Sequence, residues 1–391
     1  MRRHSSTALA ALLLAAVPLR AADCPSAVGA AAAALARLRP VPAGFAPPCR
    51  TIAPTALKGE LDRKLRRDLP IAPELFLQTL YRLGLVAEQP DDVYPRLLDF
   101  YASQVLGFYE PDGDELVVVD HGTATASVAT MVWVHELAHA AQEHRFHLPT
   151  RLLAERANGD AQRAASAIAE GEAMLVSLLL AAPASGGDGS LGAAAAAVRG
   201  QVEALRDQAP VPAYFIDDLA FPYTTGFTVV LAAYREGGWG AVDRLLAAPA
   251  RTTAALLYPT LPPPGPLLGD QELPSVPPGW DEVITDTVGA WGVVTWLSPR
   301  LGPAAAADLA AGWDGDRIRV IRSRSDATLW GFAWRVRARG VGERELFQRT
   351  LQLHLRPLLE RLSGGAPVSL TWISTGRELE VRAAWPAASA S

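Results

Sequence analysis

The sequence predicts an α+β protein with two differently built parts. Between about 55 and 260, apolar residues recur mainly with helical spacing, and one predicted hairpin interrupts the helices. From about 279 to 391, short alternating segments predict strands around a long helix. A proline-rich stretch, 261–278, is expected to be the linker between the two parts.

The N-terminal residues 1–21 are expected to be a signal peptide. Arg2 and Arg3 precede an apolar segment, 7–17, that is too short to span a bilayer, and Leu19-Arg20-Ala21 offers a cleavage site. We therefore expect an exported protein, periplasmic or extracellular, without stable membrane insertion after cleavage. Removal of this peptide would take away three arginines and no acid, so the formal net charge of −5 would become −8. That charge argues against nucleic acid as a partner.

Two cysteines, Cys24 and Cys49, lie in an Ala/Pro-rich N-terminal segment, 22–54, of which residues 25–50 are expected to be partly extended. In an exported protein they are expected to form one disulfide, with two free thiols as the alternative.

The part from 55 to 260 is predicted to be mainly helical. Residues 73–84 have helical periodicity with Gly84 as the stop, and 91–105 form a second helix. Residues 106–109 and 115–120 flank the turn Pro111-Asp-Gly-Asp114 and predict a hairpin. The further expectations are helices at 126–144, 158–180, 193–208 and 225–235, with a Gly/Ser linker at 182–192.

The C-terminal part is expected to form a ββαββ antiparallel unit. Trp330, Phe332 and Trp334 alternate as one buried strand face would. The expected elements are helices at 280–297 and 304–311, strands at 317–321 and 328–337, a helix at 343–362, and strands at 368–373 and 378–384. We expect this unit to pack against or shape the substrate region.

The helix at 126–144 carries the pattern H-E-x-x-H at His135, Glu136 and His139. Residues four apart lie one turn apart on the same face of a helix, so both imidazoles can bind one Zn²⁺ at about 2.0–2.1 Å. Glu136 can then reach a water molecule and act as general base. Burial of these polar groups in an apolar helix is costly unless a metal satisfies them. The alternative is a solvated helix with incidental histidines.

The third metal ligand is expected on the second apolar helix, where Glu170 and Glu172 flank Gly171. The two carboxylates point about 200° apart on a helix, so one of them can face the metal. Gly171 is expected to permit close approach to the first metal-binding helix. The alternative is that both carboxylates are surface charges.

These motifs resemble those of the gluzincins, zinc hydrolases in which a glutamate on a second helix completes a His, His, Glu site. The segment Glu170-Gly-Glu-Ala173 is similar to the E-G-x-A motif of aminopeptidase N-type enzymes, and this match favours Glu170 as ligand. A resemblance over most of the mature chain is to secreted bacterial proteins with H-E-L-x-H-A-x-Q and E-G-[DE]-A motifs, here His135–Gln142 and 170–173. The resemblance implies a zincin-like fold, with the hairpin strand lining the cleft above the active helix.

The expected activity is zinc-dependent hydrolysis of a peptide bond in a peptide or protein substrate, with Glu136 as base. In gluzincins a Tyr or His downstream of the third ligand stabilises the oxyanion, and Tyr223 in Pro222-Tyr-x-x-Gly226 is the first candidate, before Tyr258 and Tyr234. Two alternatives stay open: a non-catalytic, zinc-stabilised envelope protein, and a zinc hydrolase acting on a non-peptide amide.

Overall fold

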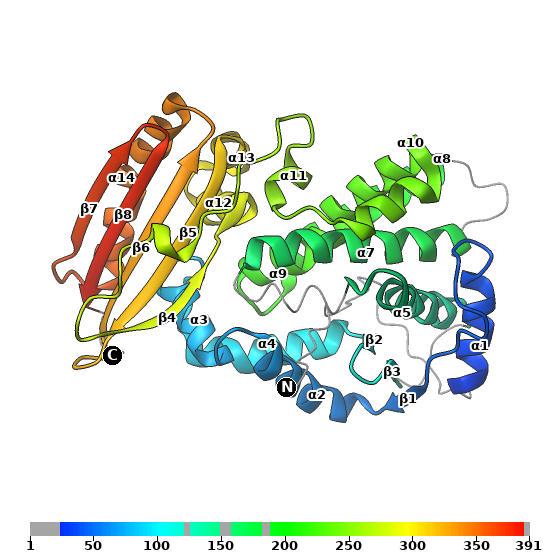
Figure 1. Ribbon diagram of the computed structural model, residues 1–391. Helices are drawn as coiled ribbons and strands as arrows, with labels where there is room; N and C mark the ends of the chain where they lie inside the picture. The colour runs from blue at the N-terminus through cyan, green and yellow to red at the C-terminus, as the bar shows by residue number, and fades with distance from the viewer. Residues whose placement is uncertain (1–23, 121–125, 149–157, 182–187, 387–391) are drawn as a thin grey trace. The chain divides into compact units, whose positions relative to one another are not determined.

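The computed structural model describes residues 24–120, 126–148, 158–181 and 188–386 (Figure 1). This part of the chain contains helices and two sheets, which confirms the α+β class. The predicted signal peptide, 1–21, lies outside it. Two compact units are formed. The first comprises Met1–Leu69, Asp91–Glu155 and Gln162–Ala250, and the second comprises Pro70–Pro90, Arg156–Ala161 and Arg251–Ser391.

This division differs from the one that the sequence predicted. Residues 70–90, 156–161 and 251–278 belong to the second unit, although all of them precede the expected boundary at 279. Helix α3 (Pro73–Arg82) shows why, since Leu75 and Tyr81 pack against the hydrophobic core of the second unit. The indole N–H of Trp296 also donates to the carbonyl oxygen of Leu83, at 3.0 Å. Helix α3 belongs to the second unit because its apolar side chains are buried against residues far away in the sequence. The spacing of apolar residues predicts a helix, but it does not reveal which part of the chain the helix packs against.

The first unit contains a three-stranded sheet with the order β1-β3-β2. Strands β2 (Gly107–Glu110) and β3 (Glu115–Val119) form the predicted hairpin, with Tyr109 opposite Leu116. Strand β1 (Cys49–Ile52) joins β3 in parallel. Strand β2 is therefore an edge strand of this sheet, on the side where α5 lies.

The helices of the first unit pack on this sheet and on one another. In Figure 1, α5 lies between α7 and the β2–β3 hairpin. Val134 and Leu137 of α5 share a core with Leu116 and Val118 of β3. The helices are α1 (Cys24–Leu35), α2 (Pro54–Asp68), α4 (Pro90–Gln104), α5 (Ala126–Phe146), α7 (Gly159–Ala181), α8 (Asp188–Gln208), α9 (Ala213–Phe221), the π-helical turn η1 (Pro222–Gly226) and α10 (Phe227–Ala247).

The Ala/Pro-rich N-terminal segment begins with helix α1, whose alanine run has high helix propensity, and continues through non-helical backbone into strand β1, so it is extended in part, as expected. Two local expectations for this unit need correction. Helix α8 begins at Asp188, inside the segment 182–192 that was predicted to be a linker; residues 182–187 lie outside the described part. Helix α10 continues past 235 to Ala247, with non-helical backbone angles at Gly237 and Gly238. Cys24 and Cys49 form the predicted disulfide.

Helix α7 is, within the described residues, the one helix long and apolar enough to cross a membrane. In its most apolar 18-residue window, 72% of the residues are buried inside the protein. Its apolar character therefore fits a helix in the core of the first unit.

The second unit is built on a five-stranded antiparallel sheet with the order β4-β5-β6-β8-β7. The predicted ββαββ unit is confirmed as β5 (Trp313–Ser323), β6 (Leu329–Ala338), α14 (Val341–Leu362), β7 (Ser369–Thr375) and β8 (Glu378–Pro386). The helix expected at 280–297 is partly wrong. Residues 280–286 form strand β4 (Trp280–Asp286), which pairs with the edge of β5, and helix α12 (Gly289–Leu301) begins after it.

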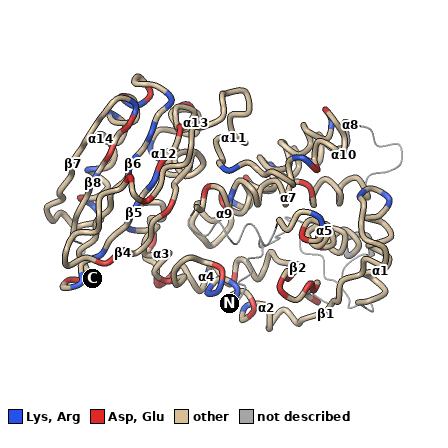
Figure 2. The backbone as a smooth tube through the Cα atoms, in the orientation of Figure 1, with Lys and Arg blue, Asp and Glu red and all other residues tan. Residues whose placement is uncertain are grey.

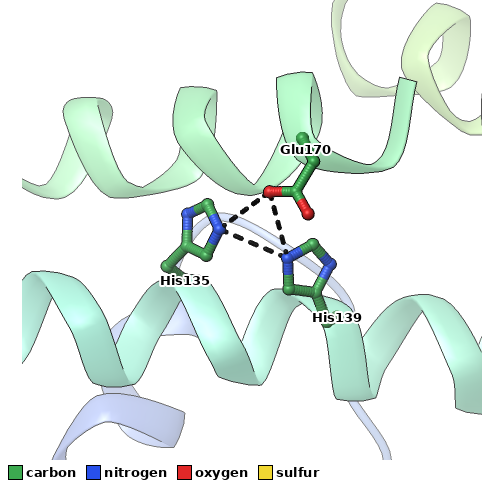
Figure 3. A group of neighbouring side chains, drawn as sticks. All are labelled: His135, His139 and Glu170. Atoms are coloured by element: carbon green, nitrogen blue, oxygen red, sulfur yellow. Dashed lines mark hydrogen bonds and ion pairs between the residues drawn. The ribbon is translucent and has the colours of Figure 1, made fainter. Parts of the chain in front are cut away.

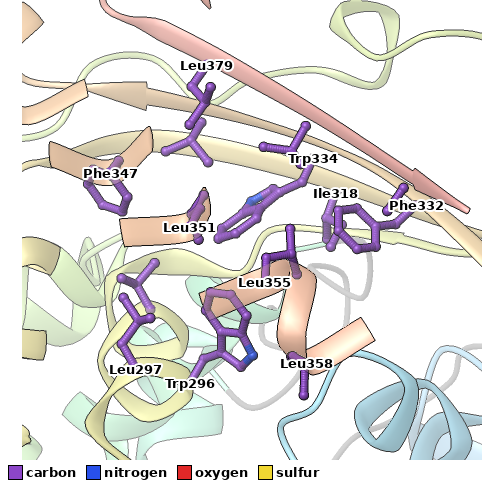
Figure 4. Packing of buried hydrophobic residues seen from close by; sticks show 14 of the residues in the cluster. Trp296, Leu297, Ile318, Phe332, Trp334, Phe347, Leu351, Leu355, Leu358 and Leu379 are labelled. Carbon is purple, nitrogen blue, oxygen red and sulfur yellow. The ribbon is translucent and has the colours of Figure 1, made fainter. Parts of the chain in front are cut away.

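Helices α12, α13 (Pro303–Ala311) and α14 supply the apolar side chains that bury one face of this sheet (Figure 4). Trp330, Phe332 and Trp334 all lie in this core, as their alternation predicted. Trp296 and Trp334 meet edge to face, with ring centroids 6.0 Å apart. This arrangement gives the second unit a hydrophobic core of its own.

Arginines alternate with core residues along β5 and β6, so they lie on the other face of the sheet. Figure 2 marks the positions of Lys and Arg along the backbone in blue. Arg319 donates to the carbonyl oxygen of Pro274 at 2.6 Å, and Arg335 donates to that of Glu272 at 2.7 Å. Arg337 binds the Pro266 carbonyl and, at 2.9 Å, the carboxylate of Asp314. The segment predicted to be a linker, 261–278, is therefore tied by hydrogen bonds to the sheet of its own unit.

Candidate metal centre

Helix α5 places the two histidines of the H-E-x-x-H pattern on one face. His135 and His139 are buried, and their Nε2 atoms lie 3.2 Å apart. The neighbours Val132, Val134 and Leu137 face the core of the first unit, which fixes the rotation of the helix. The predicted pair of histidines therefore converges as the four-residue spacing requires.

Helix α7 supplies the third group of the cluster. Figure 3 shows the Glu170 carboxylate pointing from α7 toward both imidazoles. Its Oε2 atom lies 3.1 Å from Nε2 of His135 and 3.5 Å from Nε2 of His139. Among the described residues, these three form the one cluster with the spacing of a metal site. Glu170, rather than Glu172, is the carboxylate that meets the histidines.

The cluster has the dimensions of a tetrahedral zinc site. Bonds of about 2.0–2.1 Å at tetrahedral angles place ligand atoms about 3.3 Å from each other. The three observed separations are 3.1, 3.2 and 3.5 Å. The second oxygen of Glu170, Oε1, is buried and has no hydrogen-bond partner among the described residues. Two imidazoles and one carboxylate are also the donor set of catalytic zinc sites, so the residues fit this metal.

Glu136 follows His135 on α5, and its side chain lies against strand β2. A Cβ atom built on Gly107 of β2 would lie 3.5 Å from the Cγ of Glu136, so the strand approaches this side chain closely. Burial raises the pKa of Glu136 to about 8, against opposing effects that include the charge of His139 and a backbone hydrogen bond with Tyr109. Its Oε2 atom has no hydrogen-bond partner in the part of the chain that the structure describes. A carboxylate with a pKa near neutrality and a free oxygen is suited to proton transfer.

The protonation of the metal-free cluster follows from burial and from the charge of Glu170. Burial lowers the pKa of His135, although Glu170 opposes this shift. For His139, burial also acts to lower the pKa, but the Glu170 carboxylate outweighs it and raises the pKa to about 9. The pKa of Glu170 is held well below its usual range, because the histidines outweigh the effect of burial. The metal-free cluster therefore favours a proton on His139, and a bound cation would have to replace it.

Tyr223 lies at the cluster, as the sequence predicted for the segment Pro222–Gly226. Its hydroxyl donates to Oε2 of Glu170 at 3.0 Å, and its ring centroid lies 6.5 Å from that of His135. It belongs to the π-helical turn η1, a rare conformation that is common at functional sites. Its proposed role in stabilising an oxyanion stays a prediction.

Gly171 faces a different element from the one expected. A Cβ atom at Gly171 would lie 2.6 Å from the carbonyl oxygen of Gly226, in η1 rather than in α5. A Cβ atom at Gly226 would lie 2.0 Å from the carbonyl oxygen of Ala167 in α7. The two glycines therefore allow α7 and η1 to pack backbone against backbone, which brings Tyr223 to Glu170.

Gln142 and Glu172 have roles that the sequence did not reveal. The His139 Nδ1 atom lies 3.1 Å from Oε1 of Gln142, and Nε2 of Gln142 donates to Glu172 at 2.7 Å. Glu172 is also bonded at 2.8 Å by the buried Arg39. Gln142 and Glu172 belong to the two sequence motifs, since Gln142 ends the H-A-x-Q pattern and Glu172 follows Gly171. Arg39 lies far from both motifs in the sequence and belongs to no motif that could have predicted its contact.

The remaining candidates do not join the cluster. Tyr258 donates to the carbonyl oxygen of Ala307 in the second unit, and the ring of Tyr234 lies against Trp239. Asp160, at the start of α7, accepts hydrogen bonds from the backbone and side chain of Thr253 and does not meet the histidines.

Comparison of the chain with models of protein families, with curated proteins and with solved structures finds no match. The resemblance to zinc hydrolases therefore depends on the motif residues and on the geometry in which they meet.

Proposed function

We propose that this protein is an exported zinc-dependent metallohydrolase, a gluzincin-like peptidase. The observation that carries the proposal is the convergence of His135, His139 and Glu170 at tetrahedral zinc spacing. Glu136, the candidate base, adjoins the first ligand on the same helix. A closed structural zinc site needs a fourth protein ligand and no such base.

A bound zinc ion would supply Lewis acidity toward a water molecule and toward the carbonyl group of the substrate. Glu136 accepts a proton from the attacking water and passes it to the leaving amine, so that one amide and one water give one acid and one amine. The hydroxyl of Tyr223 donates a hydrogen bond to the oxygen that becomes negative.

The first experiment is to measure the zinc content of purified residues 22–391. We expect one zinc per wild-type chain and weaker binding in Glu170→Ala. Glu136→Gln should keep the zinc and lower the rate of peptide cleavage by about 10²–10⁴-fold, because it removes the base and not a ligand. Cleavage is followed with a peptide library, and simple amides are included to test the non-peptide alternative.

A matched control is Glu143→Gln, on the same helix but two turns beyond Glu136. Glu143 lies 3.5 Å from the exposed His147, so this variant should keep both zinc and activity. Full cleavage activity in Glu136→Gln would overturn the mechanism. A folded wild-type chain that takes up no zinc after reconstitution would overturn the whole proposal.

One observation favours a second candidate, a zinc-stabilised envelope protein without catalysis. His135, Glu136, His139 and Glu170 are each less than a tenth exposed. Such a protein would bind one zinc, gain thermal stability from it, and cleave no member of the library, and Glu136→Gln would change neither zinc content nor any activity.

A further inference from the structure

The first unit contains a buried chain of polar side chains that begins at a proposed zinc ligand and ends at an arginine far away in the sequence. His139, Gln142, Glu172 and Arg39 are each less than a tenth exposed. Their contacts run from Nδ1 of His139 to Oε1 of Gln142, then from Nε2 of Gln142 to Glu172, and from Glu172 to Arg39. None of these contacts lies on the side of His139 that faces Glu170.

The hydrogen bonds of Gln142 settle which way its amide points. Its Nε2 atom lies 2.8 Å from the carbonyl oxygen of Ala169 and 2.7 Å from the carboxylate of Glu172. Both of these partners are acceptors, so the amide nitrogen must face them and the amide oxygen must face His139. An oxygen 3.1 Å from Nδ1 accepts a hydrogen bond from the N–H at that position. In the neutral imidazole that can bind a metal, Nδ1 therefore keeps its proton and Nε2, the atom nearest Glu170 and His135, carries the lone pair.

Arg39 compensates the buried charge on which this arrangement depends. Its Nε atom lies 2.8 Å from Glu172, an Nη atom lies 2.7 Å from Asp243, and the guanidinium rests on the ring of Trp239. Without Arg39 the buried Glu172 carboxylate, which accepts a hydrogen bond from Gln142, would carry an uncompensated charge at a cost in stability.

Arg39 is held beside Glu172 because helix α1, which precedes it, packs in the core and because a disulfide encloses its segment. It follows helix α1, and its backbone N–H donates to the carbonyl oxygen of Leu35 at 2.9 Å. Val28 and Leu35 of α1 lie in the same hydrophobic core as Leu137 of α5. The disulfide between Cys24 and Cys49 encloses the segment.

We propose that Arg39 is a positioning residue for the metal centre: through Glu172 and Gln142 it holds His139 in the tautomer and orientation that present Nε2 to the zinc ion. The inference rests on the zinc site of the proposed function and not on catalysis. His135 offers a contrast within the same site, since its Nδ1 atom has no partner among the described residues.

The test measures zinc affinity by competition with a chelator, on folded full-length mature protein. Gln142→Leu removes the acceptor for His139 and should weaken zinc binding about 10–100-fold. Arg39→Met should weaken it by a factor in the same range, and Arg39→Lys should restore part of the loss. The matched control is Arg145→Met. Arg145 binds the same Asp243 as Arg39 but, among the described residues, forms no ion pair with Glu172, so zinc affinity should stay within about twofold.

The double variant Arg39→Met/Gln142→Leu separates this inference from a general loss of stability. If both residues act through one chain, the double variant should bind zinc no more weakly than Gln142→Leu alone. In the zinc-loaded wild type, the Nδ1 proton of His139 should give a slowly exchanging NMR signal, and this signal should disappear in Gln142→Leu.

Unchanged zinc affinity in folded Arg39→Met would overturn the inference while the proposed function stands, and so would losses that multiply in the double variant. If Arg39→Met does not fold, the NMR signal and the affinity of Gln142→Leu decide the matter, because that variant keeps the Arg39–Glu172 ion pair. A wild-type protein without zinc would remove both the proposed function and this inference.

Discussion

Gly171 and Gly226 meet backbone to backbone, and this contact sets the position of Tyr223 relative to Glu170. A Cβ atom at either glycine would lie 2.6 Å or less from a carbonyl oxygen of the other segment. Helix α7 and the turn η1 can therefore approach more closely than side chains would permit, and the Tyr223 hydroxyl comes to 3.0 Å from the Glu170 carboxylate. The glycines of two separate motifs thus have one structural purpose.

Gly226→Ala should destabilise the protein, because the new methyl group meets a backbone oxygen that cannot move independently of α7. We expect a loss of about 1–3 kcal/mol, the usual cost of an overpacked core. Urea unfolding measures it. The control is Gly200→Ala in α8, where a Cβ atom meets nothing within 4 Å, and this change should be neutral or stabilise by up to about 1 kcal/mol. Equal effects at the two positions would contradict the contact.

Tyr223→Phe should lower kcat for peptide cleavage by about 10²–10³-fold and change KM little, because the lost hydrogen bond forms mainly in the transition state. Zinc content should stay at one per chain. Tyr258→Phe removes a hydroxyl that binds the backbone of Ala307, and it should leave kcat unchanged. A loss of zinc in Tyr223→Phe, with unchanged turnover per bound zinc, would instead assign the hydroxyl to holding Glu170.

The stabilisation that zinc provides should grow as the pH rises from 6 to 9. In the metal-free protein, burial raises the pKa of Glu136 from 4.5 to about 8, and the pKa of His139 is raised from 6.5 to about 9 by Glu170 against the effect of burial. The folded state thus favours the protonated form of both groups. Their contributions to stability are present at low pH and are lost as the pH rises through these folded-state pKa values. The pKa of Glu170 is lowered, so its contribution to the free energy of unfolding is fully present above pH 4.5 and is lost as the pH falls below that value.

Bound zinc would take the place of the proton on His139. Zinc therefore binds more tightly at high pH, where His139 has already lost much of that proton. Thermal unfolding with and without zinc at pH 6, 7, 8 and 9 measures the effect. In Glu170→Ala the zinc-induced shift of Tm should be small at every pH. A shift of the same size at all four pH values in the wild type would contradict the proposed protonation of the cluster.

Replacement of both Cys24 and Cys49 by serine should lower the free energy of unfolding by about 3 kcal/mol, the loop-entropy value for a closure of this length. The cysteines are separated by 25 positions. Urea unfolding of wild type with and without reductant gives an independent measure, and reductant should not affect the double variant. If reductant destabilised both proteins equally, its effect would not come from this disulfide.

The elements that the sequence predicted well are those whose signals are local. The hairpin around Pro111–Asp114, the stop of α3 near Gly84 and the alternating face of Trp330, Phe332 and Trp334 each follow from turn chemistry or from periodicity. Strand β4 was missed because its conformation depends on pairing with the edge of β5. The segment 261–278 was read as a linker because proline marks loops, whereas arginines of distant strands bind its carbonyl groups.

The candidate site divides in the same way. The sequence by itself determined His135, Glu136 and His139, since a four-residue spacing on one helix is enough to bring two imidazoles together. It also determined Glu170 as the favoured third group and Tyr223 as a candidate. Tertiary structure decided that Gly171 meets Gly226 and not α5, that Glu172 binds Arg39 and Gln142, and that Asp160 binds Thr253. These contacts join segments far apart in the chain, and they form because packing of the helices brings these particular groups within contact distance.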